Sequence, residues 1–199
     1  MGKEKYRKEI ESLFSKSPLV SFSSISKIIK NKKKVKHYEK RLINELTKRG
    51  SINRLTKGYY TKLDEPSLLV LTMKPAYLGL QDALSFHNLW EQETIPVIIT
   101  SRKVRQGLRK TLGQNLMVKR IKQKLMFGFD YYQQGIVALP YSDIEKTFLD
   151  MLYFKENLDN NVLKNFRKRI NKKKLGSYLK KYPEKFQYKV QTNFQKFLP

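Results

Sequence analysis

Apolar residues in the first third of the chain recur three and four positions apart in three separate stretches. This is the spacing of a helix with one buried face. The stretches run from Tyr6 to Phe14, from Phe22 to Ile29 and from Val35 to Leu46. Ser17-Pro18 follows the first stretch and Gly50 follows the third, and both are residue types that end helices. The pattern therefore predicts three short amphipathic helices.

Two short runs rich in β-branched and aromatic residues follow the third helix. They cover residues 52–55 and 59–63, and Thr56-Lys57-Gly58 separates them. Such runs around a glycine-containing turn predict a β-hairpin. Three helices followed by a hairpin are typical of a winged helix, whose third helix enters the major groove of DNA while the hairpin lies along the backbone. We therefore expect a winged helix-turn-helix domain over residues 1–65.

The hydrophobic pattern after Asp64-Glu65-Pro66, which we interpret as a linker, predicts a second domain over residues 66–199. Residues 68–71 are interpreted as a short apolar strand or lead-in, and further strands are predicted at residues 95–100, 116–121, 125–129 and 135–139. Helical spacing predicts helices at residues 77–89 and 142–153, the second with Ser142 and Glu145 as a capping box, and two or three more over residues 161–198. The predicted fold class is α+β: an N-terminal winged helix-turn-helix, a mixed α/β domain and a basic helical C-terminal tail.

The charge balance points to a polyanionic partner. The 199 residues contain 42 Lys and Arg against 17 Asp and Glu, a formal net charge of +25. Hydrophobic residues make up 40% of the chain, so it can form a core and is not a disordered polycation. DNA, RNA or an acidic membrane surface would attract such a charge, and solubility alone is the alternative explanation.

Several other classes of function are disfavoured. The chain has no cysteine and only two histidines, His37 and His87, which argues against a disulfide scaffold and a metal site. It also lacks a glycine-rich phosphate loop and a His-Glu-x-x-His pair. No apolar run approaches the roughly 18 residues that span a bilayer, and the basic start lacks the apolar stretch of a signal peptide. We expect a cytoplasmic protein without catalytic residues, cofactor, metal or membrane partner.

The predicted third helix carries its polar residues opposite its apolar ones. Placed at about 100° per residue, the polar face consists of Lys33, Lys36, His37, Lys40, Arg41, Asn44 and Lys48. Arg41 and Asn44 can form bidentate contacts with guanine or adenine, and the lysines can contact phosphates. An ordinary surface helix mixes charges of both signs, so this face favours DNA contact. Arg54, Lys57 and Tyr59 of the hairpin are further candidates, with Lys57 at its tip.

Two more basic clusters lie in the second domain. Nine Lys and Arg residues and no acid occur between Arg102 and Phe129, and Arg102, Lys103 and Arg105 are candidate DNA contacts in a predicted mobile loop. The other cluster extends from Arg167 to Lys174. Each cluster fits either a second polyanion site or a solvated face.

Two stretches together resemble the AbiEi family of antitoxin-type transcriptional regulators. Residues 42–60 are similar to the family's signature from recognition helix to wing, with Lys-Arg-Gly followed by Gly-Tyr-Tyr. Residues 77–92 are similar to its segment with Ala-Leu-Ser, an aromatic pair and a later Glu-Gln. Shorter matches occur at residues 95–102 and 143–150. Asn88 stands where the family has glycine, and Thr94 separates Glu-Gln from Ile95-Pro96.

The resemblance implies a DNA-binding N-terminal domain that represses its own operon and an AbiEi-like C-terminal domain needed for antitoxin activity. It also implies a nucleotidyltransferase-like toxin as functional partner in a type IV system, without a stable complex. A palindromic operator would imply self-association of two copies on DNA. The alternative is an RNA-binding or general nucleic-acid-binding protein without a toxin partner, because aromatic residues such as Phe127 and Tyr131 interleave with the basic clusters.

Overall fold

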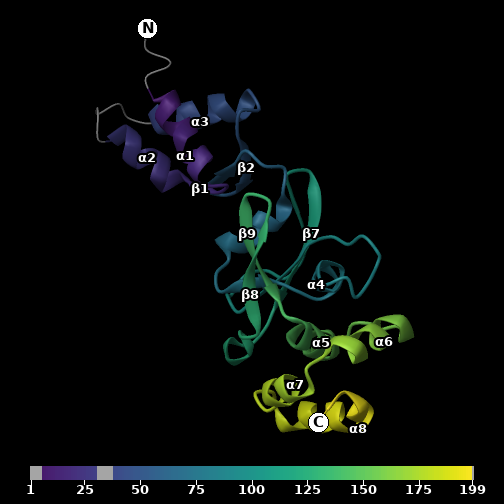
Figure 1. Ribbon diagram of the computed structural model, residues 1–199. Helices are drawn as coiled ribbons and strands as arrows, with labels where there is room; N and C mark the ends of the chain where they lie inside the picture. The colour runs from purple at the N-terminus through teal and green to yellow at the C-terminus, as the bar shows by residue number, and fades with distance from the viewer. Residues whose placement is uncertain (1–5, 31–37, 199) are drawn as a thin grey trace.

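Three helices and a small antiparallel sheet form the N-terminal region (Figure 1). The computed structural model describes residues 6–30 and 38–198. The elements are α1 (Arg7–Lys16), β1 (Val20–Ser21), α2 (Phe22–Lys30), α3 (Tyr38–Lys48), β2 (Asn53–Thr56) and β3 (Tyr59–Thr61). The strands lie in the order β1-β3-β2, and both pairings are antiparallel. Three helices and a hairpin therefore lie where the sequence predicts them.

One hydrophobic cluster holds this region together. It joins the apolar faces of the helices to the sheet through residues such as Ile10, Ile25, Ile43 and Ile52, each at most 2% exposed. Burial of aliphatic side chains of this size contributes about 1.5–3 kcal/mol each. Tertiary packing, more than intrinsic propensity, stabilises helices of 9 to 11 residues such as these.

Pro66 does not belong to a linker, and residues 68–71 do not form a strand. Pro66–Thr72 forms a 3₁₀ helix, η1, in which Pro66 to Val70 are buried. The Glu65 side chain caps it by accepting a hydrogen bond from the Ser67 backbone N–H at 3.0 Å. Leu68 and Val70 share a second hydrophobic cluster with Leu55 of β2. The hairpin therefore contributes a residue to the core of the larger sheet.

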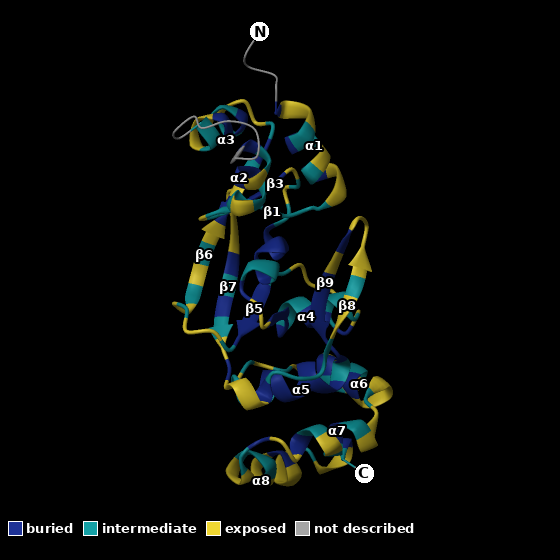
Figure 2. Ribbon diagram, turned by 90° about the vertical axis from the view of Figure 1, so that its left-hand side faces the viewer, coloured by how far each residue is buried: buried dark blue, intermediate teal, exposed yellow. Residues whose placement is uncertain are grey.

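A six-stranded mixed sheet forms the middle of the molecule. Its strands are β4 (Ala76–Leu78), β5 (Val97–Thr100), β6 (Gly107–Thr111), β7 (Gln114–Arg120), β8 (Phe129–Gln134) and β9 (Val137–Ser142), in the order β6-β7-β5-β4-β9-β8. The β4–β9 and β5–β7 pairs are parallel and the other three are antiparallel. Figure 2 shows buried residues concentrated in β5, β9 and α5.

Three predictions for this sheet are wrong, and two of them concern its edges. The supposed mobile loop at residues 102–110 includes edge strand β6, and the strand expected at residues 125–129 is instead η2 (Gln123–Leu125) followed by edge strand β8. Edge strands with a solvated face lack the continuous apolar run of a central strand. The helix expected over residues 77–89 is only α4 (Gln81–Phe86), because Tyr77 pairs with Ile99 in strand β4.

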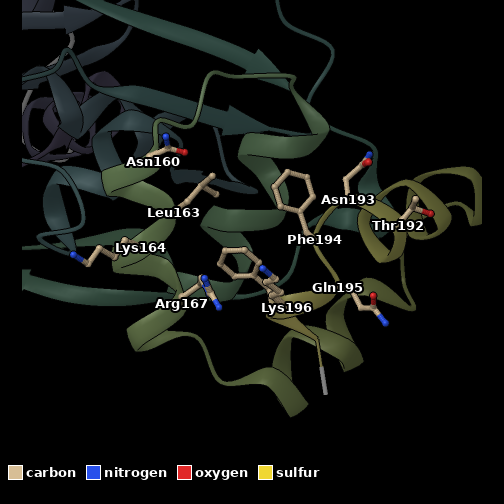
Figure 3. Close-up of a pocket in the computed structure, with 10 residues that line it drawn as sticks. Asn160, Leu163, Lys164, Arg167, Thr192, Asn193, Phe194, Gln195 and Lys196 are labelled. Atoms are coloured by element: carbon tan, nitrogen blue, oxygen red, sulfur yellow. The ribbon is translucent and has the colours of Figure 1, made fainter.

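Four helices complete the chain below the sheet in Figure 1. They are α5 (Ile144–Tyr153), α6 (Asn160–Arg169), α7 (Lys172–Leu179) and α8 (Glu184–Asn193), followed by the 3₁₀ turn η3 (Gln195–Phe197). The cap of α5 is Asp143 and not Ser142, which is the last residue of β9; the Asp143 carboxylate accepts the Lys146 backbone N–H at 2.7 Å. A cavity separates α6 from residues 192–197 (Figure 3).

Candidate nucleic-acid interface

Helix α3 presents cationic and amide side chains to solvent. Lys40, Arg41, Asn44 and Lys48, together called the α3 polar face, are all exposed. Leu42, Ile43 and Leu46 are buried on the other side of the helix. The helical period thus separates a face that packs from a face that can bind. Lys33, Lys36 and His37 lie outside the described residues.

The cations of this face are available to a ligand. Within the described parts of the chain, no carboxylate lies within 4.0 Å of Lys40, Arg41 or Lys48. The Arg41 guanidinium lies 5.6 Å from the centroid of the Tyr38 ring, a cation–π contact that orients it along the helix surface. An arginine held in this way keeps its N–H donors free for a phosphate or a base edge.

The hairpin contributes two further exposed cations. Arg54 of β2 and Lys57 in the β2–β3 turn are exposed. Tyr59 is half-buried and pairs with Ser21 and Thr56, whereas Tyr60 points into the N-terminal core. Successive strand residues face opposite sides, so Tyr59 is the outward member of the pair.

Arg102, Lys103 and Arg105 do not lie with the helix and the hairpin. Strand β6 begins after them at Gly107 and ends at Thr111, whose hydroxyl donates to the Leu55 carbonyl oxygen of β2. The three cations thus lie beyond the other end of a strand of five residues, about 13 Å long at 3.3 Å per residue. Arg102 is also tethered, because its Nη1 donates to the Thr72 carbonyl oxygen at 3.0 Å.

These residues instead belong to a second cationic surface. The Gln106 side chain accepts the Arg120 backbone N–H at 3.0 Å, and Ser101 donates to Gln123, so the loop is bonded to the segment after β7. The exposed cations of this surface, called the basal cluster, are Arg102, Lys103, Arg105, Arg120, Lys122 and Lys124. Tertiary structure therefore divides the cations of the molecule between separate surfaces.

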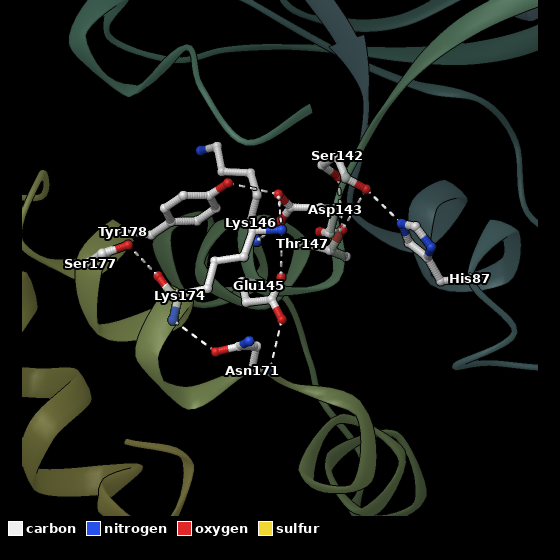
Figure 4. A network of polar contacts seen from close by, with 10 residues as sticks. All are labelled: His87, Ser142, Asp143, Glu145, Lys146, Thr147, Asn171, Lys174, Ser177 and Tyr178. Carbon is white, nitrogen blue, oxygen red and sulfur yellow. Dashed lines mark hydrogen bonds and ion pairs between the residues drawn. The ribbon is translucent and has the colours of Figure 1, made fainter. Parts of the chain in front are cut away.

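The cluster from Arg167 to Lys174 is only partly available. Arg167, Lys168, Lys172 and Lys173 are exposed. Lys174 Nζ lies 3.0 Å from Asp143 Oδ2 and 3.2 Å from Glu145 Oε2, so it is ion-paired. Arg169 donates to the backbone carbonyl oxygen of His87. Figure 4 shows how Asp143, Glu145 and Lys174 lie close together around α5.

A buried ionic network is the main feature that the sequence did not reveal. Lys146 Nζ lies 2.5 Å from Asp150 Oδ1, and both side chains are 0% exposed. The Tyr77 hydroxyl donates to Asp150 Oδ2 at 2.6 Å, and the Tyr182 hydroxyl donates to Oδ1 at 3.1 Å. Burial raises the pKa of Asp150 and lowers the pKa of Lys146, while their mutual attraction opposes both shifts. The only sequence signal is a Lys and an Asp four residues apart in a helix whose other residues, apart from Glu145 and Thr147, are apolar or aromatic.

Asp82 and His87 do not form a pair. The Asp82 carboxylate accepts the Val97 backbone N–H at 3.2 Å, and burial raises the pKa of Asp82 to about 7. His87 Nε2 donates to the Ser142 carbonyl oxygen at 2.7 Å, and burial lowers the pKa of His87. Both groups thus bind the backbone of the sheet. In the part of the chain that the structure describes, no group of three His, Asp or Glu residues could hold a metal ion.

No model of a protein family matches the chain, and no curated protein matches it. The resemblance to AbiEi regulators therefore stays a prediction. Within residues 6–30 and 38–198, no helix combines the length and the apolar character needed to cross a membrane.

Proposed function

We propose that the N-terminal region is a winged helix that binds double-stranded DNA, and that the protein is a transcriptional regulator. The element order α1-β1-α2-α3-β2-β3 and the sheet order β1-β3-β2 support this. The observation that carries the proposal is the α3 polar face, which is exposed, has no carboxylate partner among the described residues and lies opposite a buried apolar face.

Each residue of the proposed interface has a distinct role. In a helix-turn-helix, residues near the start of the recognition helix contact base edges. Arg41 and Asn44 would therefore read bases, because a guanidinium or a side-chain amide can form two hydrogen bonds to guanine or adenine. Lys40, Lys48 and Lys57 would bind phosphates, which positions the protein without reading sequence. The basal cluster would bind a different segment of nucleic acid.

The narrower role of autorepressing antitoxin rests on the resemblance to AbiEi regulators. A nucleotidyltransferase-like protein encoded by the adjacent reading frame would support it. Protection of the protein's own promoter in a footprint would support autorepression independently of any toxin.

General nucleic-acid binding, RNA included, is the second candidate, and the basal cluster favours it. That surface lies outside the helix and hairpin and groups six exposed cations. Competition between duplex DNA and a structured RNA at fixed salt distinguishes the two candidates. Preference for the duplex supports the winged helix, and preference for the RNA supports the second candidate.

Substitutions on the α3 polar face test the proposal once the footprint has defined a site. We expect Arg41→Ala to reduce discrimination between this site and random DNA by about 1–3 kcal/mol, because a bidentate base contact is lost. Lys57→Ala should weaken binding to the defined site and to random DNA to the same extent. Lys185→Ala, at an exposed position of α8, is the matched control. If Arg41→Ala lowered the affinity for the site and for random DNA equally, this would contradict base reading by α3.

A further inference from the structure

The cavity between α6 and the C-terminal residues has the size of a small-molecule site. Its volume is about 660 Å³, within the range of roughly 300–1,000 Å³ that is typical of ligand pockets. Asn160, Leu163, Lys164 and Arg167 line it from α6, and Thr192 to Phe197 line it from the end of α8 and from η3 (Figure 3).

The charges around this cavity are all positive. Lys164, Arg167 and Lys196 line it, and no Asp or Glu does. The neighbouring cavities differ, because Glu91 and Asp159 line one, which shares Lys164 with this cavity, and Glu156 lines another. Among residues 6–30 and 38–198, none of the three cations has a carboxylate within 4.0 Å. A cleft lined by one sign of charge focuses its field and concentrates counter-ions, so the cavity favours an anion.

The floor of the cavity is aromatic and fixed in place. Phe197 is 6% exposed and stacks on Phe148 at 4.8 Å between ring centroids. Phe194 is half-buried and meets the same Phe148 ring edge-on at 5.7 Å. The core therefore holds both rings from behind, and an aromatic ligand can pack on the half-buried Phe194 ring without ordering it first.

Amide groups complete the lining. The side chains of Asn160, Asn193 and Gln195 line the cavity and form no hydrogen bond within the described part of the chain. An amide offers both donors and acceptors, so it can pair with the edge of a nucleobase. The Thr192 hydroxyl instead donates to the Tyr188 carbonyl oxygen at 3.0 Å.

We propose that this cavity binds a nucleoside phosphate. Arg167 and Lys196 bind the phosphate groups, Lys164 adds to the positive field, and the base packs on the Phe194 ring with its edge toward the amides. A free nucleotide and the 5′-phosphorylated end of a nucleic-acid strand share this chemistry. The inference goes beyond DNA binding by α3, because the cavity lies at the end of the molecule opposite that helix (Figure 1).

Calorimetric titration of the full-length protein tests the proposal. The probes are ATP, GTP, CTP and UTP, with tripolyphosphate as the probe without a base. We expect 1:1 binding of at least one nucleotide, at least tenfold tighter than tripolyphosphate because the base contacts the aromatic floor. A 5′-phosphorylated tetranucleotide that binds tighter than every free nucleotide also supports the site and assigns it to a strand end.

Variants locate the binding. Arg167→Ala and Lys196→Ala should each weaken nucleotide binding at least fivefold, and Phe194→Leu should weaken it by removing the ring while keeping an apolar side chain. Lys185→Ala lies outside the cavity lining, and Arg41→Ala tests whether the α3 polar face binds the nucleotide instead. Both should bind nucleotide normally.

Three outcomes would overturn the proposal: no binding of any nucleotide at millimolar concentration, equal affinity for tripolyphosphate, or equal effects of Arg167→Ala and Lys185→Ala. Thermal unfolding of each variant shows whether it is folded. Binding of duplex DNA is measured in parallel. Because duplex binding tests the α3 interface and nucleotide binding tests the cavity, either proposal can fail without the other.

Discussion

At the scale of the residue, the buried pair Lys146–Asp150 shows how charged groups are stabilised inside this protein. Placing an isolated ion in a protein interior costs several kcal/mol. Here three donors surround the Asp150 carboxylate, and the Lys146 ammonium lies 4.9 Å from the Phe127 ring centroid and 5.3 Å from that of Tyr182. Hydrogen bonds and cation–π contacts thus replace much of the lost hydration, so both partners are needed together.

Removal of one partner should therefore be costly. We expect Lys146→Met to lower the free energy of unfolding by about 3–5 kcal/mol, because the Asp150 carboxylate is left buried without its cation. Urea unfolding measures the change. The double variant Lys146→Met/Asp150→Asn should recover part of the loss, since a neutral amide can still accept a hydrogen bond from Tyr77. Lys172→Met, at an exposed position, is the control and should change the free energy of unfolding little. An equally small change for Lys146→Met would contradict this account.

At the scale of the element, the start of β8 is fitted closely against two helices. Gly128 precedes β8 with φ +69°, in the left-handed region that favours glycine. A Cβ atom there would lie 2.8 Å from Tyr178 Cε2 of α7 and 2.9 Å from Lys146 Cβ of α5. The Asp143 carboxylate accepts hydrogen bonds from the Lys146 backbone N–H of α5 and, at 2.9 Å, from the Tyr178 hydroxyl of α7. The Asp143 backbone N–H donates to the Gly128 carbonyl oxygen at 2.9 Å, so Asp143 joins the start of β8 to both helices.

A pair of glycine substitutions separates close packing from backbone strain. Gly135 in the β8–β9 turn also has a positive φ, +56°, but a Cβ atom there would meet nothing within 4 Å. Gly128→Ala and Gly135→Ala share the cost of the left-handed backbone. We expect Gly128→Ala to lower the free energy of unfolding by about 1–3 kcal/mol more than Gly135→Ala does, since only the methyl group added at position 128 overlaps its neighbours. Thermal or urea unfolding of both variants gives the difference, and equal stabilities would show that the neighbours move aside freely.

At the scale of the whole molecule, the positive charge is divided between two surfaces that lie toward opposite ends of strand β6. The α3 polar face and Lys57 belong to the N-terminal region, whereas Arg102, Lys103 and Arg105 lie beyond the far end of β6. Each phosphate contact contributes about 0.9 to the log–log dependence of affinity on salt. The slope of log affinity against log salt concentration therefore measures how many phosphates of a given DNA the protein contacts.

Two triple variants compare the surfaces on a duplex of about 12 base pairs, roughly 41 Å at 3.4 Å per pair. We expect Lys40→Gln/Lys48→Gln/Lys57→Gln to reduce the salt slope by up to about 2.7, as three phosphate contacts are lost. Arg102→Gln/Lys103→Gln/Arg105→Gln should leave the slope nearly unchanged. Equal reductions would mean that both surfaces bind the same duplex, contrary to the proposal that the basal cluster binds a different segment of nucleic acid.

The sequence by itself determined the elements whose signals are local. Helical spacing in residues 6–48 and the residues around Lys57 identified three helices and a hairpin, and the same spacing placed Lys40, Arg41, Asn44 and Lys48 on the exposed side of α3. A period of 3.6 residues separates buried from exposed positions within one helix, so no distant contact is needed to read it.

Only the tertiary structure decided what depends on partners distant in the chain. Edge strands β6 and β8 exist because β7 and β9 pair with them, although their own residues lack a core pattern. Lys146 is buried against Tyr77 of β4 and Tyr182 of the turn between α7 and α8, which are both distant from it in the chain. The C-terminal cavity likewise joins α6 to η3. Strand pairing, charge burial and cavity shape arise from long-range contacts, which residue spacing does not encode.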